Sequence, residues 1–132
     1  MSIVGIGVDL VEIDRIEAAI ARHGDRFLAR IFTEEERSYC ARAKRPGPCY
    51  AARFAAKEAV SKAFGTGIGE RLSWQDIRVE RRASGCPVVV LSGAGGDLAR
   101  ELGIDEVLLS ISHSEKFAVA QAVAVGPNKT PQ

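Results

Sequence analysis

The chain has 132 residues, of which 46% are hydrophobic and 27% are charged, as in a single compact globular domain. Its 18 basic and 17 acidic residues leave a formal net charge of +1, which argues against a protein held on nucleic acid by overall charge. The sequence shows neither the roughly 20 apolar residues of a membrane span nor the basic start of an export signal, so we expect a cytoplasmic protein without nucleic-acid or membrane partners.

The chain begins with a predicted strand and an amphipathic helix. Residues 3–11 are rich in β-branched side chains and include two glycines, a composition that favours a buried strand. Ile13, Ile16 and Ile20 then share one face of a helix whose other side carries charged residues as far as Arg26. We therefore expect this helix to bury one apolar stripe.

Two more helices are predicted before residue 65. Thr33 precedes three glutamates, which is typical of a helix N-cap, and this helix should end near Lys44, ahead of Pro46-Gly47-Pro48. Residues 49–64 are rich in alanine and contain neither glycine nor proline, so they predict the most regular helix of the chain. Gly65 should terminate it.

The second half of the chain consists mainly of predicted strands. We expect four strands and one short helix, the helix third in order, over residues 77–81, 88–91, 95–102, 107–112 and 117–125. Short turns join neighbouring strands, which makes the sheet mostly antiparallel and the fold class α+β. We assign residues 1–125 to one domain and residues 126–132 to a disordered tail.

The chain contains three cysteines, Cys40, Cys49 and Cys86. Their number is odd and their spacing is not that of a metal site. In a cytoplasmic protein we therefore expect three reduced thiols.

Asp9 stands near the end of the otherwise apolar first strand. A charged group in such a place costs free energy unless it is paired or bound to a cation. From this residue alone, a carboxylate that caps the next helix or meets an arginine is the simpler interpretation.

The long predicted helix carries Glu58 and Lys62 at i and i+4, with Arg53, Lys57 and Ser61 on the adjoining stripe. From spacing alone, a solvated charged face is the simpler interpretation. The alternative is that the helix presents acid, base and hydroxyl groups to a common cleft. Two carboxylates from separate elements suit Mg²⁺, which is usually held by one or two acids together with phosphate and water. A nearby lysine would neutralise phosphate oxygens during group transfer.

Two other features bear on phosphate binding. His113 ends a predicted strand, where it could donate to a phosphate or simply terminate the strand. Its serine neighbours point to the opposite face, so they do not form a nucleophilic pair with it. The glycine-rich residues 65–69 follow a helix rather than precede one, which indicates a helix stop and not a phosphate-binding loop.

Taken together, two segments resemble the holo-acyl-carrier-protein synthases, the small class of 4′-phosphopantetheinyl transferases. These segments are Gly5-Ile6-Gly7-Val8-Asp9 and Arg53-Phe54-Ala55-Ala56-Lys57-Glu58-Ala59-Val60-Ser61-Lys62-Ala63. Weaker support comes from residues 32–36, 65–67 and 110–114, so that the resemblance runs from Ile3 to about Val125.

The resemblance implies a reaction and a fold. The family moves the phosphopantetheine arm of coenzyme A onto a serine of an acyl carrier protein in fatty acid biosynthesis, depends on Mg²⁺, and releases adenosine 3′,5′-bisphosphate. Its fold is a mostly antiparallel sheet packed on a long central helix. The family assembles as a homotrimer with active sites between neighbours.

The resemblance also implies roles for the charged residues of the first strand and the long helix. Asp9 and Glu58 match the metal-binding carboxylates, and Lys62 matches the lysine near the diphosphate. The serine proton would go to Glu58 or to a metal-bound water, and the sequence leaves this choice open.

Coenzyme A contacts are implied elsewhere in the chain. Arg53 and His113 match positions near the phosphates of coenzyme A, and His113 is expected to act across a subunit interface. Gly85 and Pro87 match the hairpin that lines the nucleotide pocket. Cys86 stands between them where the family often has a basic residue, which is a departure from the family pattern.

The first helix matches the helix that docks the acidic carrier protein. Arg15 is the main candidate contact, followed by Arg22 and Arg26. A second departure is Phe117, where the family often has a tyrosine.

Two rival hypotheses remain at the level of sequence. In the first, the same transfer serves the carrier domains of polyketide or peptide synthetases, although a basic first helix favours free-standing acidic carriers. In the second, the chain is a coenzyme A-binding trimer without catalysis. Retention of Asp9, Glu58 and Lys62 argues against the second hypothesis, because a binder would not require a metal pair beside a lysine.

Overall fold

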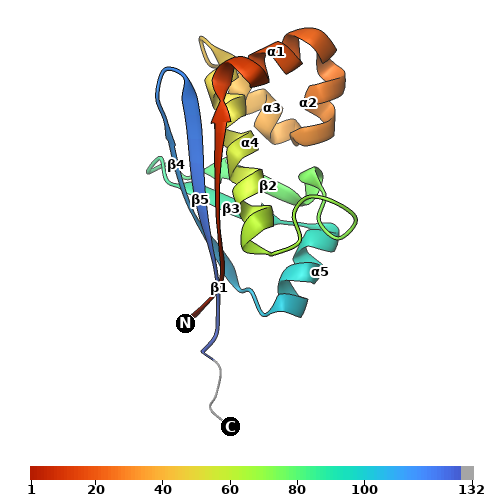
Figure 1. The fold of residues 1–132 in the computed structure, drawn as a ribbon, viewed down its shortest axis with the longest axis vertical. Helices are drawn as coiled ribbons and strands as arrows, with labels where there is room; N and C mark the ends of the chain where they lie inside the picture. Colours follow the sequence, from red (N-terminus) through yellow and green to blue (C-terminus); the bar gives the residue numbers. More distant parts are fainter. Residues whose placement is uncertain (129–132) are drawn as a thin grey trace.

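The structure is a computed structural model that describes residues 1–128 (Figure 1). In chain order its elements are β1 (Ser2–Glu12), α1 (Ile13–His23), α2 (Asp25–Ile31), α3 (Glu34–Ala41), α4 (Pro46–Ala63), the short 3-10 helix η1 (Trp74–Asp76), β2 (Ile77–Arg81), β3 (Pro87–Leu91), α5 (Gly93–Leu102), β4 (Glu106–His113) and β5 (Phe117–Gly126). The antiparallel strands β1, β5 and β4 form one sheet in that order, and β2 and β3 form a separate antiparallel hairpin. The predicted α+β fold, with a mostly antiparallel sheet packed on a long helix, is confirmed.

The core lies between α4 and the inner face of the three-stranded sheet. The central strand β5 turns a row of buried alanines toward this core at residues 118, 120, 122 and 124. The facing side of α4 is also built from small side chains, among them Ala55, Ala59 and Ala63. Because both surfaces are shallow, the helix packs close to the sheet.

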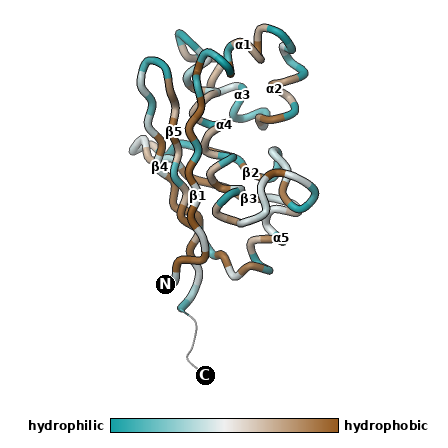
Figure 2. The backbone as a smooth tube through the Cα atoms, in the orientation of Figure 1, coloured by the Kyte–Doolittle hydropathy of each residue, from teal (hydrophilic) through white to brown (hydrophobic). Residues whose placement is uncertain are grey.

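The outer face of the same sheet is apolar and uncovered. Ile6 and Leu10 of β1 are each 64% exposed, and Val8 between them is 57% exposed. Leu108 of β4 lies in the same row of the sheet as Ile6, and it is also exposed. Figure 2 shows the hydrophobic colouring that runs along β1. An apolar surface of this kind usually marks a protein contact.

The predicted first helix is broken in two. Gly24 adopts a positive φ of 58° and its N–H bonds to the oxygen of Ile20, so α1 ends at His23 and α2 begins at Asp25. Only glycine enters this region of φ without strain. The turn therefore redirects the chain within what the sequence pattern treated as one helix.

The limits of the next two helices also differ from the predicted ones. The helix that begins after Thr33 ends at Ala41 instead of Lys44, and the long helix begins at Pro46 instead of Cys49. Proline is well accommodated in the first turn of a helix, where its missing N–H has no intrahelical partner to lose. Pro46-Gly47-Pro48 therefore forms the first turn of α4 and also separates α4 from α3.

The last strand extends one residue beyond its predicted end at residue 125. Gly126 is the last residue of β5 and pairs with Ser2, and the amino group of Met1 bonds to the side chain of Asn128. The rest of the predicted disordered tail, residues 129–132, lies outside the described residues. Within residues 1–128, no helix combines the length and the apolar character needed to span a membrane.

Candidate active site

Two glycines of β1 allow this strand to touch α4 directly. A Cβ atom at Gly7 would lie 2.0 Å from the backbone oxygen of Ala59, and one at Gly5 would lie 1.9 Å from that of Ala63. Any side chain at these positions would therefore push the strand away from the helix. Asp9 follows Gly7 by two residues, so it lies on the same, helix-facing side of the strand.

The close approach places Asp9 beside Lys62 of α4. Lys62 Nζ lies 3.0 Å from Asp9 Oδ1 and 2.9 Å from the backbone oxygen of Val8, and it donates hydrogen bonds to both. The side chain of Lys62 is 49% exposed, whereas that of Asp9 is 18% exposed. Asp9 is thus paired with a lysine rather than with the predicted arginine or helix cap.

Glu58 lies one helical turn before Lys62. Its side chain is partly buried, and this burial raises the pKa of the Glu58 carboxyl above its ordinary value. The Asp9 carboxylate raises the pKa further, while Lys62 lowers it. The three charged groups therefore interact, and Glu58 is the carboxylate that accepts a proton more readily than an ordinary glutamate.

This arrangement suits a hard divalent cation together with phosphate. A cation placed between two neighbouring carboxylates neutralises the repulsion between their charges. Among residues 1–128, no group of three or more His, Cys, Asp or Glu side chains is placed to hold a metal ion. Asp9 and Glu58 could by themselves supply at most two protein ligands, the number with which Mg²⁺ is often bound when water and substrate phosphate complete its shell.

A shallow depression lies beside Lys62. It has a volume of about 370 Å³ and is lined by Ile6, Gly7, Val8 and Gln121. Small-molecule sites start at about 300 Å³, so this depression is large enough for part of a ligand that reaches the lysine.

The other predicted ligand-binding residues lie apart from this group. His113 is exposed at the end of β4, and its row of the sheet is two residues beyond the row of Asp9, on the far side of β5. Gly85 adopts a positive φ of 90° in the exposed β2–β3 turn, and Pro87 begins β3. The structure does not bring these three residues into contact with Asp9.

The predicted solvated stripe of α4 is wrong for all three of its members. Arg53 is 3% exposed, and Lys57 and Ser61 are completely buried. The Ser61 hydroxyl donates to the backbone oxygen of Glu58 at 2.7 Å, so it bonds within the helix. These residues face the core because α3, η1 and β2 cover this side of α4, which helical spacing alone does not reveal.

Arg53 occupies an unusual place for a guanidinium group. It stacks over the ring of Tyr39 at 4.4 Å and contacts Cys49 Sγ at 3.3 Å. Its Nε is buried and has no hydrogen-bond partner. Burial lowers the pKa of Arg53, while the charge of Glu36 opposes this shift.

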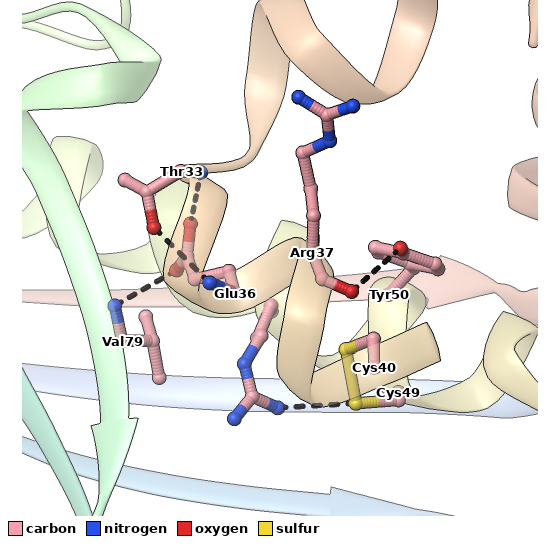
Figure 3. The surroundings of a disulfide bond; sticks show 8 residues. Thr33, Glu36, Arg37, Cys40, Cys49, Tyr50 and Val79 are labelled. Atoms are coloured by element: carbon pink, nitrogen blue, oxygen red, sulfur yellow. Dashed lines mark hydrogen bonds between the residues drawn. A yellow bond between two sulfur atoms is a disulfide. The ribbon is translucent and has the colours of Figure 1, made fainter. Parts of the chain in front are cut away.

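Sequence reasoning missed the buried partner of Lys57. The two Glu36 oxygens accept bonds from Lys57 Nζ at 2.7 Å, from the N–H of Thr33 at 2.8 Å and from the N–H of Val79 at 2.8 Å. Figure 3 shows the bonds from Thr33 and Val79. The Thr33 hydroxyl oxygen in turn accepts a hydrogen bond from the Glu36 N–H, which completes the capping box and confirms the predicted N-cap. The capping pattern of Thr33 and Glu36 can be recognised in the sequence. No neighbouring residue indicates that Lys57 is the partner of Glu36.

The prediction of three reduced thiols is also wrong. Cys40 at the end of α3 and Cys49 in the first turns of α4 form a disulfide, with their Cα atoms 5.5 Å apart (Figure 3). The turn between the two helices brings these Cα atoms within the range that a disulfide spans. Cys86 is free and exposed.

The predicted carrier-docking residues lie on the surface. Arg15 and Arg22 are both exposed on α1, and Arg26 is exposed on α2. A further basic residue, Arg45, donates two hydrogen bonds to Glu17 of α1, at 3.0 and 2.7 Å.

The chain matches a known protein family over most of its length. The model of the 4′-phosphopantetheinyl transferase superfamily matches residues 5–122. The holo-[acyl-carrier-protein] synthase of Chlamydia trachomatis serovar L2 is 52% identical over 120 residues, which cover 91% of this chain and 98% of that protein.

Solved structures show the same relationship. The holo-[acyl-carrier-protein] synthase of Neisseria meningitidis has a TM-score of 0.89 at 39% identity, covering 94% of this chain and 99% of that one. The Helicobacter pylori enzyme, solved in complex with coenzyme A, has a TM-score of 0.82 at 35% identity, covering 91% and 99%. The match over residues 5–122 and a relative that is 52% identical over 91% of the chain show that the chain belongs to the 4′-phosphopantetheinyl transferase superfamily.

Proposed function

We propose that this chain transfers the 4′-phosphopantetheine arm of coenzyme A to a serine hydroxyl of an apo acyl carrier protein. Relatives about half identical to it are named for this activity, and the Helicobacter pylori relative binds coenzyme A. The observation that carries the proposal is the meeting of Asp9, Glu58 and Lys62, from two separate elements, at a partly exposed site.

In this proposal Asp9 and Glu58 hold Mg²⁺. When bound, the ion would neutralise the diphosphate of coenzyme A and so lower the barrier to attack on it. The chain supports the ion with two carboxylates and leaves its remaining ligands to phosphate and water, as is usual for Mg²⁺.

The residues of the chain then serve the bond changes. The serine oxygen forms a bond to the phosphorus next to the pantetheine arm, and the bond from that phosphorus to the leaving adenosine 3′,5′-bisphosphate breaks. Lys62 is exposed enough to donate to the diphosphate oxygens on which charge develops. The serine proton would pass to the Glu58 carboxylate or to a water beside it, the two acceptors that the family resemblance leaves open.

The nucleotide portion of coenzyme A would lie against four residues. Gly85 and Pro87 lie in a hairpin whose turn is open to solvent, and His113 has an exposed imidazole that can donate to a phosphate. Arg53 is assigned to coenzyme A by its place in the family motif alone, since its side chain is almost wholly buried within one chain. These assignments rest on the positions that each residue shares with the family motifs.

The active molecule is proposed to be a homotrimer. The exposed row of Ile6, Val8 and Leu10 forms an apolar face that a second and third copy of the chain would cover. Assembly would also explain why His113 is remote from Asp9 within one chain, since it could serve a neighbour's site. Light scattering coupled to size exclusion tests this state directly.

The carrier protein would dock on α1. Arg15 and Arg22 offer exposed positive charge to an acidic carrier helix, and such charge mainly speeds and orients association. We further propose that the reaction serves fatty acid biosynthesis in the cytoplasm, with coenzyme A and acyl carrier protein as its two substrates.

One experiment tests the central proposal. The protein is mixed with coenzyme A, Mg²⁺ and an apo acyl carrier protein, and the intact mass of the carrier is recorded. We expect a gain of one phosphopantetheine group that EDTA abolishes. If folded protein and a competent carrier give no gain, the proposed transfer is contradicted.

A further inference from the structure

A buried ion pair holds the root of the β2–β3 hairpin. Lys57 and Glu36 have side chains with no exposed surface, and Lys57 Nζ lies 2.7 Å from Glu36 Oε1. Lys57 also donates to the backbone oxygens of Trp74 at 3.0 Å and Ile77 at 2.6 Å, while Glu36 Oε2 accepts from the N–H of Val79 at 2.8 Å. Three hydrogen bonds from the pair therefore end on residues 74–79.

These residues lead directly into the hairpin. β2 starts at Ile77 and pairs with β3 as far as Arg81 opposite Pro87, and the turn that contains Gly85 projects beyond that last pair. Ile77 and Val79 also bury their side chains in the core. Apolar contacts of this kind are non-directional, whereas the three hydrogen bonds define where β2 sits along α4.

Stability alone does not account for an ion pair at this place. Most of the buried neighbours on α4 are alanines, and well-packed apolar side chains often replace a buried ion pair without loss of stability. Directional polar bonds, by contrast, can select one arrangement among several packed ones. Lys57 is adjacent to Glu58 in the chain, so α4 connects the position of the hairpin to the candidate active site.

We infer that Glu36 and Lys57 are positioning residues that fix the β2–β3 hairpin relative to Asp9, Glu58 and Lys62 and thereby set the affinity for coenzyme A. The inference rests on the proposed function, in which Gly85 and Pro87 contact the nucleotide. Both positioning residues are buried, so they act through the hairpin and not by touching substrate. They should affect coenzyme A binding more than the rate of transfer.

Two variants of the full chain test this inference. Glu36→Asp keeps the charge that compensates Lys57 but shortens the carboxylate by one methylene, and Glu36→Gln/Lys57→Met removes both charges. Steady-state kinetics with Mg²⁺ and apo carrier give kcat and the KM for coenzyme A, and calorimetry without carrier gives its Kd. We expect KM and Kd to rise together by about 10-fold, with kcat at saturating coenzyme A within about 3-fold of the original.

A matched control separates positioning from general destabilisation. Val125→Ala removes buried apolar volume near the end of β5, where Val125 pairs with Ile3 and Glu106, and it should leave the KM for coenzyme A unchanged. If the pair variants behave like this control, with kcat falling in step with the folded fraction at constant KM, the inference is overturned. If the double variant does not fold, Glu36→Asp decides the question. Absence of transfer and of coenzyme A binding in the original protein would instead contradict the proposed function.

Discussion

The helix α4 carries two lysine–carboxylate pairs that differ in their surroundings. Lys57 and Glu36 are fully buried and bond to the backbone of η1, β2 and the start of α3. Lys62 and Asp9 lie at the edge of the sheet, where half of the lysine side chain is exposed. The two charges of the first pair neutralise each other inside the protein, where no substrate reaches them. An anionic substrate can reach the lysine of the second pair. The same two residue types thus hold the fold on one side of the helix and remain available for chemistry on the other.

Removing one lysine at a time should give the largest effect and tests this distinction directly. Lys57→Met leaves the Glu36 carboxylate buried without its counter-charge, which should lower the free energy of unfolding by about 3–5 kcal/mol. Lys62→Met, the matched control, disrupts a partly exposed pair and should cost about 1 kcal/mol or less. Urea unfolding followed by circular dichroism measures both. Equal losses would contradict the assignment of different roles.

Sequence patterns predicted the features of the fold that depend on neighbouring residues. The Thr33 cap, the helix stop at Gly65 and the Gly85 turn each need only a few adjacent side chains, and all three are present. The break at Gly24 and the helix start at Pro46 were missed because both residues are compatible with more than one local structure. Local sequence favours such alternatives without choosing between them.

Local sequence patterns predict even less about the contacts of the candidate active site and its surroundings. Asp9, Glu58 and Lys62 were identified by resemblance, and the structure explains their meeting through the close approach of Gly5 and Gly7 to α4. The burial of Lys57 depends on a carboxylate 21 residues earlier in the chain and on backbone oxygens 17 and 20 residues later. Helical spacing describes the direction of a side chain but not what packs against it, so these partners required the structure.

Glu58 interacts with the exposed Lys62–Asp9 pair, so its substitution should change activity, whereas substitution in the buried pair should change stability. Glu58→Gln keeps the size of the side chain but removes its charge, and it should lower kcat/KM by about 100-fold or more while the protein stays folded. The transfer assay, with circular dichroism of the same sample, checks both parts. Glu70→Gln, an exposed change on the loop after α4, is the matched control and should retain full activity. Full activity of Glu58→Gln would remove this carboxylate from the site.

The Cys40–Cys49 disulfide should stabilise the same side of α4 as the buried Lys57–Glu36 pair. It joins the helix that carries Glu36 to the helix that carries Lys57 across a separation of nine residues, so breaking it should lower the free energy of unfolding by about 2–3 kcal/mol. Urea unfolding with and without a reductant measures this loss. In Cys49→Ser the reductant should have no further effect, whereas Cys86→Ser should behave like the original protein. An original protein that is insensitive to reductant would contradict a structural role for the bond.

We expect the smallest effect from the ionisation of Glu58, which should make both stability and activity depend on pH. Because the two should change in opposite directions, this test best separates stability from activity. Burial and the Asp9 charge raise the pKa of this carboxyl in the folded state above its ordinary value of 4.5, with Lys62 in opposition. The folded protein therefore holds the proton more tightly than the unfolded chain, so the stability contributed by Glu58 is full below pH 4.5 and is lost as the pH rises through the raised pKa.

Unfolding in EDTA across this pH range should thus show Glu58→Gln gaining stability relative to the original protein toward neutral pH, because glutamine cannot ionise. Activity should run in the opposite direction, since a cation binds the ionised carboxylate, and with Mg²⁺ present it should fall only at a pH below the raised pKa of the metal-free protein, because the cation competes with the proton. Parallel stability curves for the two proteins would show that the Glu58 charge is not disfavoured in the folded state. The half-buried carboxylate would then resemble an ordinary surface glutamate, and the contrast between the two sides of α4 would rest on Lys62 and Asp9 alone.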